Sequence, residues 1–403
     1  MALRLPTARD VAGLIVASAL AAGALSSLAR SETIEQTQPE VAAKPDFTVT
    51  RIAGPFNFPW SVAFLPEGLI LVTERWGDLK LIVPGEPEPL LISGTPERLT
   101  ADHAGLMDVV LDPEFANNDT IYLSYVYGTR EAATIRVLKA RLDIENLSLE
   151  DSKLIFESFP PTAGTEQLGG RMAIDRAGLL YLTLGDRFDG RHAQNLSDDY
   201  GKITRMRRNG TFPDDNPFIG TPQARPGIWS YGHRNQQGLA FDPADGQLWA
   251  IEHGPMGGDE LNRIEPGRNY GWPLITYGVD YDGSPINHGL TEAEGLEQPV
   301  RYWVPSIGPS GLTLYGGHVS DWQSTAWLGS LASQMLVRVK LENGRVILEE
   351  HFLKDELGRI RDVRMGPDGL IYFTTDSEEG SLYQIAPTEE YATKSKMSQG
   401  RLE

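Results

Sequence analysis

The sequence predicts an all-β protein, a six-bladed β-propeller with four-stranded antiparallel blades. Three observations support this fold class: one short phrase recurs six times, its segments alternate with the period of a strand, and long helical periodicity is absent. The phrase is a β-rich run, a turn containing Pro, Asp or Gly, and a second β-rich run. Recurrence of one such unit is typical of architectures in which each unit packs against its neighbours.

The copies of the phrase extend over most of the chain. They run from Ser61 to Val72, Met107 to Tyr125, Arg171 to Leu184, Gly238 to Glu252, Leu312 to Val339 in a degenerate form, and Asp362 to Thr375. Segments such as Leu-Tyr-Leu-Thr-Leu at 180–184 have strand alternation, and Asp/Gly turns join neighbouring strands into hairpins. Each copy is therefore predicted to be a strand pair, completed by two outer strands into a blade of roughly 40–50 residues.

Two other fold classes fit less well. A parallel α/β fold would require helices between the strands, and a β-sandwich explains the alternation but not six copies of one phrase. Propellers gather loops at one end of a central channel, so that end is the expected site. The inserts between the third and fifth copies are the longest and carry the unusual residues.

Composition restricts the partners of the protein. Its 403 residues include 55 acidic and 36 basic side chains, for a formal net charge of −19. Such a charge repels phosphate backbones and anionic lipid surfaces, so we expect no nucleic-acid partner. The absence of cysteine excludes thiol nucleophiles, disulfides and Cys-based metal sites, and it is compatible with an oxidising compartment.

The N-terminal segment indicates export. Two arginines precede an apolar run at residues 11–29, which ends in the small-x-small form of a signal-peptidase site. We expect a periplasmic protein, with membrane contact only if this segment is an uncleaved anchor. The predicted organisation is a signal peptide or anchor at 1–29, a flexible tether at 30–46, the propeller at 47–388 and a polar C-terminal tail at 389–403.

The densest group of functional side chains lies between residues 228 and 273. The guanidinium and amide of Arg234-Asn235 suit a planar anionic ligand, although the same pair also suits a role in stabilising the loop. Backbone carbonyls at Gly254-Pro255 are hard oxygen ligands suited to Ca²⁺. Glu260, with Asp259 beside it and Tyr270 ten residues later, offers oxygens for a second calcium site, but acidic residues in Gly-rich loops commonly form only solvated turns.

Several motifs in this region resemble one family. The segments Tyr-Gly-His-Arg-Asn-Gln-Gln-Gly (231–238), Glu-His-Gly-Pro-x-Gly-Gly-Asp-Glu-Leu-Asn (252–262) and Gly-x-Asn-Tyr-Gly-Trp-Pro (267–273) are similar to soluble aldose sugar dehydrogenases that use pyrroloquinoline quinone (PQQ). The similarity extends over about residues 47–386. It implies PQQ- and calcium-dependent oxidation of an aldose at the anomeric carbon to a lactone. The partners implied are a small-molecule sugar and an electron acceptor that the sequence does not identify.

The resemblance also implies a role for individual residues. It assigns the Ca²⁺-binding carbonyls to Gly254 and Pro255, cofactor contacts to Arg234 and Asn235, pairing with cofactor carboxylates to Arg359 and Arg361, and a structural calcium site to Glu260 and Tyr270. Calcium would polarise the quinone carbonyl that accepts hydride, while a general base takes the proton of the anomeric hydroxyl.

Two positions depart from the family pattern. Gln167 occupies the position of the catalytic histidine, and a glutamine cannot accept a proton. Ala332 replaces a lysine that often contacts the quinone. Conversely, His103 lies where relatives carry a glutamine that faces substrate and cofactor, so His103 is a candidate base and cofactor contact, or else a polar histidine of the channel. Glu166 is a weaker candidate, because an exposed carboxylate is too acidic.

These departures leave alternatives to a dehydrogenase. One is a propeller with altered chemistry, or a non-catalytic binding module, because the base position holds Gln167. Another is a calcium-dependent lactone or ester hydrolase. The histidines show no zinc-binding spacing such as H-E-x-x-H, and neither a Gly-x-Ser-x-Gly nor a Gly-x-Gly-x-x-Gly motif occurs.

Overall fold

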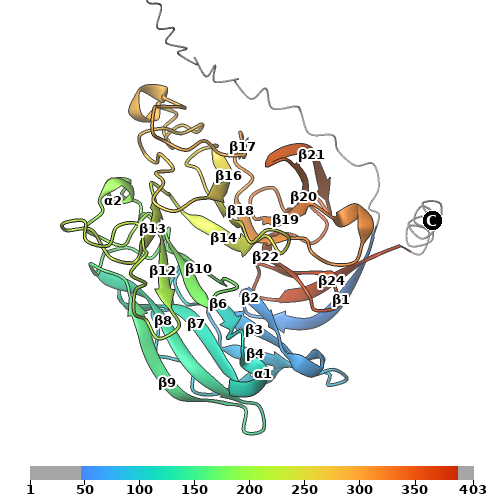
Figure 1. Ribbon diagram of the computed structural model, residues 1–403. Helices are drawn as coiled ribbons and strands as arrows, with labels where there is room; N and C mark the ends of the chain where they lie inside the picture. The colour runs from blue at the N-terminus through green and yellow to red at the C-terminus, as the bar shows by residue number, and fades with distance from the viewer. Residues whose placement is uncertain (1–46, 389–403) are drawn as a thin grey trace, which may run out of the picture. The chain divides into compact units, whose positions relative to one another are not determined.

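The computed structural model describes residues 47–388 and confirms the predicted six-bladed β-propeller. Six four-stranded antiparallel sheets are arranged in a ring around a common centre (Figure 1). The first strand of each sheet packs beside the first strands of the two neighbouring sheets. The predicted signal peptide or anchor, the tether and the C-terminal tail lie outside the described residues.

The strands follow chain order from blade to blade. Blade 1 consists of β2 (Pro59–Phe64), β3 (Ile70–Glu74), β4 (Leu79–Ile82) and β5 (Leu90–Ile92). Blade 2 consists of β6 (Leu106–Leu111), β7 (Thr120–Thr129), β8 (Ala132–Asp143) and β9 (Ser148–Glu157). Blade 3 consists of β10 (Gly169–Ile174), β11 (Leu179–Leu184), β12 (Lys202–Arg207) and β13 (Ile228–Tyr231). Blade 4 consists of β14 (Gln236–Phe241), β15 (Leu248–Glu252), β16 (Asp259–Ile264) and β17 (Arg301–Trp303). Blade 5 consists of β18 (Pro309–Leu314), β19 (Thr325–Ser330), β20 (Met335–Glu342) and β21 (Arg345–Phe352). Blade 6 consists of β22 (Ile360–Met365), β23 (Ile371–Thr375), β24 (Gly380–Pro387) and β1 (Phe47–Phe56).

Helical structure is confined to short turns in the described part of the chain. These are α1 (Phe115–Asn118), α2 (Arg191–Gln194) and the 3₁₀ turns η1 (Pro66–Gly68), η2 (Ile286–Gly289) and η3 (Ser320–Trp322). Between residues 47 and 388, no helix has the length and apolar character needed to span a membrane.

In five blades the recurring phrase corresponds to the two inner strands, as predicted. The degenerate copy at residues 312–339 differs, because it covers β18, β19 and part of β20, the third strand of blade 5. Its aspartate organises the turn: Asp175 Oδ1 accepts hydrogen bonds from the backbone N–H groups of Ala177 (2.9 Å) and Leu179 (2.8 Å). In three blades a tyrosine of the second strand also donates to this aspartate, as Tyr122 to Asp112 (2.7 Å), Tyr181 to Asp175 (3.3 Å) and Tyr372 to Asp368 (2.8 Å). The motif therefore encodes a braced hairpin rather than a catalytic group.

The ring is closed by the N-terminal strand. The first described strand, β1, pairs with β24 in antiparallel register, with Phe47 opposite Pro387, and supplies the outer strand of blade 6 (Figure 1). Each interface between neighbouring blades contains its own cluster of buried apolar side chains. Inner strands such as β3 and β19 are buried along their whole length, because a neighbouring blade packs against each of their two faces.

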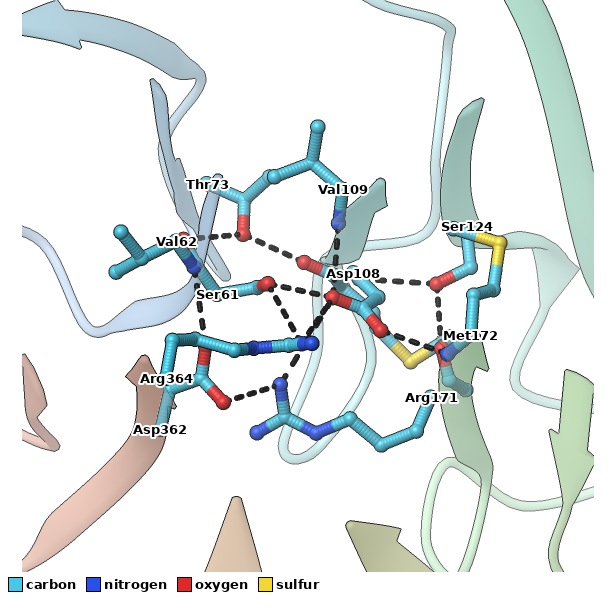
Figure 2. A network of polar contacts seen from close by, with 12 residues as sticks. Ser61, Val62, Thr73, Asp108, Val109, Ser124, Arg171, Met172, Asp362 and Arg364 are labelled. Carbon is cyan, nitrogen blue, oxygen red and sulfur yellow. Dashed lines mark hydrogen bonds and ion pairs between the residues drawn. The ribbon is translucent and has the colours of Figure 1, made fainter. Parts of the chain in front are cut away.

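Charged side chains fill the channel between the inner strands (Figure 2). Asp108 of blade 2 accepts hydrogen bonds from Ser61 Oγ (2.5 Å) and Arg364 Nη2 (2.8 Å). Asp362 of blade 6 receives Arg171 Nη1 of blade 3 at 2.8 Å and Arg364 Nε at 3.0 Å. Burial lowers the pKa of Arg171 to about 10, an effect that the charges of Asp362 and Asp108 oppose. This network joins four of the six blades through one cluster of polar side chains.

Candidate functional site

The topology brings distant segments to one end of the channel. Within each blade the first two strands are antiparallel, so the residue before the first strand lies beside the residue after the second strand. Asn235 thus precedes β14 while His253 follows β15, and Arg359 precedes β22 while Asp376 follows β23. Their backbones are hydrogen bonded, from His253 N to Asn235 O (3.0 Å) and from Asp376 N to Arg359 O (2.7 Å).

A cavity of about 520 Å³ opens at this end and receives side chains from all six blades. The residues predicted from the sequence that line it are His103, Gln167, Arg234, Asn235, Gly254, Pro255, Arg359 and Arg361, together with Ala332. Further lining residues include Phe58, Trp60, Arg75, Phe188, Gln237, His253, Tyr281 and Asp376. Glu260 and Tyr270 line a separate, much smaller cavity.

One wall of the main cavity is strongly cationic. Asp376 Oδ2 accepts hydrogen bonds from Arg359 Nε and Arg361 Nη2, both at 3.1 Å, and Asp376 Oδ1 lies 3.7 Å from Arg75 Nη2. Burial alone would raise the pKa of Asp376, but the charges of Arg361 and Arg75 lower it well below its ordinary value. Arg361 Nη1 also donates to Gln237 Oε1 at 3.1 Å. Three arginines therefore share one carboxylate, which leaves a wall suited to an anion.

Sequence reasoning missed Arg75 and Asp376. Each residue follows directly after the second strand of a phrase, β3 for Arg75 and β23 for Asp376. The same position after β15 holds His253. An examination of this position in every copy of the phrase would have found both residues.

Gln167, at the predicted position of the base, is buried, and both polar atoms of its side chain are hydrogen bonded. With its amide oriented to match its neighbours, Nε2 donates to Asp186 Oδ1 (2.6 Å) and Oε1 accepts from Arg234 Nη2 (2.8 Å). Asp186 also accepts hydrogen bonds from Trp272 Nε1 (2.7 Å) and from the backbone N–H of Phe188 (3.0 Å). Burial raises the pKa of Asp186 to about 6, although the charge of Arg234 opposes the shift.

His103 and Asn235 present free polar atoms to the cavity. The His103 ring is accessible and makes no hydrogen bond with any residue from 47 to 388. Burial and the charge of Arg361 lower the pKa of His103, which favours the neutral ring at neutral pH. Asn235 Oδ1 accepts from Gly169 N (3.2 Å) and Gln237 Nε2 (3.0 Å). The Asn235 amide nitrogen has no partner among residues 47–388, so it is available for a ligand.

Arg234 contacts the Gly254-Pro255 corner. Its Nη1 donates to the Gly254 carbonyl at 2.5 Å, and its Nη2 donates to the Tyr281 hydroxyl at 3.0 Å. The Pro255 carbonyl accepts no hydrogen bond within the described range. Asp259 braces the corner by accepting from the backbone N–H groups of Gly254 (2.9 Å) and Ile307 (2.7 Å). This corner therefore offers one free and one shared carbonyl oxygen to a hard cation.

The second cavity, of about 10 Å³, has room for a single small ion or water. Asn262 Nδ2 donates to both Glu252 Oε1 (3.0 Å) and Glu260 Oε2 (3.1 Å), while Asn262 Oδ1 is buried without a partner in the described part of the chain. Burial and the charge of Glu252 raise the pKa of Glu260 to about 8. A cation in this cavity would balance the charge of the two carboxylates.

Tyr270 lines this small cavity, but its hydroxyl is engaged elsewhere. The Tyr270 hydroxyl donates to Arg263 O (2.7 Å) and accepts from Glu265 N (2.8 Å), and its ring stacks on His233 at 4.6 Å. A calcium contact by Tyr270 would therefore involve its main chain. Across the described chain, no group of three or more acidic or histidine side chains is arranged to hold a metal.

The fold and the cavity define a six-bladed β-propeller with an arginine-lined cavity at one end of its channel. The chain belongs to the glucose/sorbosone dehydrogenase family, whose family model matches residues 56–384.

The relatives of this chain include sugar dehydrogenases. It is 38% identical over 350 residues to aldose sugar dehydrogenase YliI of Escherichia coli K12, a match that covers 86% of this chain and 94% of YliI. It is 37% identical to an uncharacterised protein of Synechocystis over 88% of both chains.

Solved structures agree with these relatives. The apo form of the soluble aldose sugar dehydrogenase from Escherichia coli matches with a TM-score of 0.82 and 37% identity, over 85% of this chain and all of the other. The PQQ-bound aldose sugar dehydrogenase from Streptomyces coelicolor matches with a TM-score of 0.70 and 25% identity, over 86% of this chain and 99% of the other. Family and relatives thus indicate an oxidoreductase of the aldose sugar dehydrogenase type.

Proposed function

We propose that the protein is a PQQ- and calcium-dependent dehydrogenase that oxidises aldose sugars at the anomeric carbon to lactones. The observation that carries the proposal is the common cavity of His103, the arginine wall and the Gly254-Pro255 corner. Bound quinone supplies a hydride acceptor there, and calcium supplies Lewis acidity. The free amide nitrogen of Asn235, the unshared Pro255 carbonyl and the cationic wall fit such a cofactor and its ion.

In this mechanism His103 is the general base. An imidazole nitrogen of His103 takes the proton of the anomeric hydroxyl while the C–H bond at the same carbon gives up a hydride and the C=O bond of the lactone forms. Neighbouring positive charge favours the neutral, proton-accepting ring. Gln167 orients Arg234 toward the Gly254 carbonyl and takes no proton itself.

A reconstitution experiment tests the proposal. Purified protein is loaded with PQQ and Ca²⁺ and offered a panel of aldoses with a dye as electron acceptor. We expect dye reduction that requires both additions and yields a lactone. A protein that binds PQQ but turns over none of the sugars would be a binding module instead. That alternative is favoured by one observation, the fully hydrogen-bonded glutamine at position 167.

The proposed location is the periplasm. It is based on the apolar segment at residues 11–29, which lies outside the described residues. Cell fractionation of the full chain, with N-terminal sequencing of the mature protein, tests both the location and cleavage after residue 29.

A further inference from the structure

Arg75 has a side chain whose guanidinium makes no hydrogen bond with any described residue. The residue follows β3, its side chain is 7% exposed, and it lines the main cavity. None of its side-chain nitrogens donates a hydrogen bond within residues 47–388, and its buried Nε has no partner. The nearest carboxylate oxygen, Asp376 Oδ1, is 3.7 Å from Nη2, which is too long for a hydrogen bond. A guanidinium has five N–H donors, so this arrangement is costly unless a ligand or solvent in the cavity accepts hydrogen bonds from them.

Two aromatic rings hold the Arg75 side chain in place. Its guanidinium carbon lies 4.7 Å from the ring centroid of Phe58 and 5.0 Å from that of Trp76. These cation–π contacts favour the charged guanidinium, but the rings are not ordinary hydrogen-bond acceptors for its N–H groups. They therefore present the guanidinium to the cavity without using its donors.

The surrounding charges also leave Arg75 unbalanced. Among residues 47–388, the carboxylate that lies nearest to it, Asp376, already accepts hydrogen bonds from Arg359 and Arg361. Three positive charges and one negative charge give this wall a formal excess of two positive charges. Burial and the charge of Arg361 lower the pKa of Arg75 to about 10, so it remains protonated at neutral pH.

We propose that Arg75 is a third arginine of the cofactor site and binds a carboxylate of the quinone. This inference rests on the proposed function and adds a residue to it. PQQ is a planar tricarboxylate, so it supplies several acceptors in one plane, whereas Arg359 and Arg361 are partly occupied by Asp376. Arg75 also supplies positive charge to a cavity in which Ala332 replaces the lysine expected from the family pattern.

Binding of PQQ to the apo protein tests the proposal without relying on turnover. Titration is followed by quenching of tryptophan fluorescence, in the presence of Ca²⁺, for the native protein and for Arg75→Gln. Charge-assisted hydrogen bonds to a buried site correspond to roughly ten- to hundredfold in affinity, so we expect the Kd of Arg75→Gln to rise by that factor. Arg345→Gln, at an exposed position in β21, is the matched control and should leave the Kd unchanged.

A neutral probe separates charge recognition from a general change in the site. The trimethyl ester of PQQ lacks the carboxylate charges, so its Kd should be nearly the same for the native protein and Arg75→Gln. If Arg75→Gln does not fold, Arg75→Lys replaces it; because an ammonium lacks the bidentate fork, we still expect weaker binding of the acid and little change for the ester.

The outcomes distinguish this inference from the proposed function. Native protein that does not bind PQQ would overturn both. Native protein that binds PQQ while Arg75→Gln binds it equally well would overturn only the assignment of Arg75. A third outcome would also overturn the inference: Arg75→Gln binds PQQ as tightly as the native protein, but its KM rises for an acidic sugar relative to the neutral counterpart of that sugar. This outcome would assign the carboxylate to the substrate.

Discussion

Gln167 links Asp186 to Arg234, with a 2.6 Å hydrogen bond to the carboxylate and a 2.8 Å hydrogen bond from the guanidinium. This one amide joins the loop after β11 to the loop before β14, on two different blades. The side chain at the expected position of the base therefore orients its neighbours. Two histidines line the cavity, and of these His253 contacts the Pro309 carbonyl, whereas the His103 ring makes no hydrogen bond with any described residue.

Replacing Gln167 with alanine is expected to lower both stability and activity. Buried Asp186 would lose a donor, which costs about 1–3 kcal/mol in the free energy of unfolding. Arg234 would lose an acceptor and its fixed orientation, so kcat/KM should fall by about tenfold. Urea denaturation and steady-state kinetics measure these effects. Gln223→Ala, at an exposed position that also has positive φ, should match the native protein.

His103→Ala is expected to remove the general base. We expect kcat to fall by about 10²–10⁴-fold while the Kd for PQQ changes much less. In the native enzyme kcat should rise with pH as His103 loses its proton, with a midpoint below the ordinary value of about 6.5 because burial and Arg361 lower this pKa. The variant should lack this acid limb. Exposed His318 serves as the control, and activity that survives in His103→Ala with its pH profile intact would exclude His103 as the base.

Calcium is expected to stabilise the protein most at alkaline pH. Because the folded-state pKa of Glu260 is raised to about 8, the stability linked to its proton is present below about pH 4.5 and is lost as pH rises through 8. A cation that binds the Glu252–Glu260 pair removes this loss. Calcium should therefore raise the Tm more at pH 8 than at pH 6, and Glu260→Gln should abolish the difference. An equal effect of calcium at both pH values in the native protein would contradict a cation at this pair.

The channel network is expected to contribute strongly to stability. Arg171→Met removes the guanidinium that forms an ion pair with Asp362 and donates a hydrogen bond through Nε (2.7 Å) to the backbone carbonyl of Gln237. Breaking a buried ion pair on one side leaves an uncompensated charge, so unfolding should become easier by about 3–5 kcal/mol. Exposed Arg263→Gln should change stability by less than about 0.5 kcal/mol. Similar urea midpoints for both variants would show that the network contributes little.

Much of the fold could be predicted from the sequence, because its strands and turns follow from local sequence patterns. Alternation and the Asp-containing turn predicted the inner strand pairs, and six copies predicted the number of blades. The pairing of β1 with β24 was not visible, because the two strands are separated by almost the whole chain and no local motif joins them. The turn aspartates and their tyrosine partners act only within one hairpin, so they identify a blade but not its neighbours.

By itself, the sequence determined the class of protein and most of the residues near the cavity, since motif identity and strand order place loop ends at one end of a propeller. Only the tertiary structure decided which side chains are free and which are engaged. Gln167 is held between two blades, the Tyr270 hydroxyl is turned to its own loop, and Arg75 finds no hydrogen-bond acceptor within residues 47–388. The physical reason is that hydrogen-bond satisfaction depends on partners from other blades, and sequence spacing does not encode those distances.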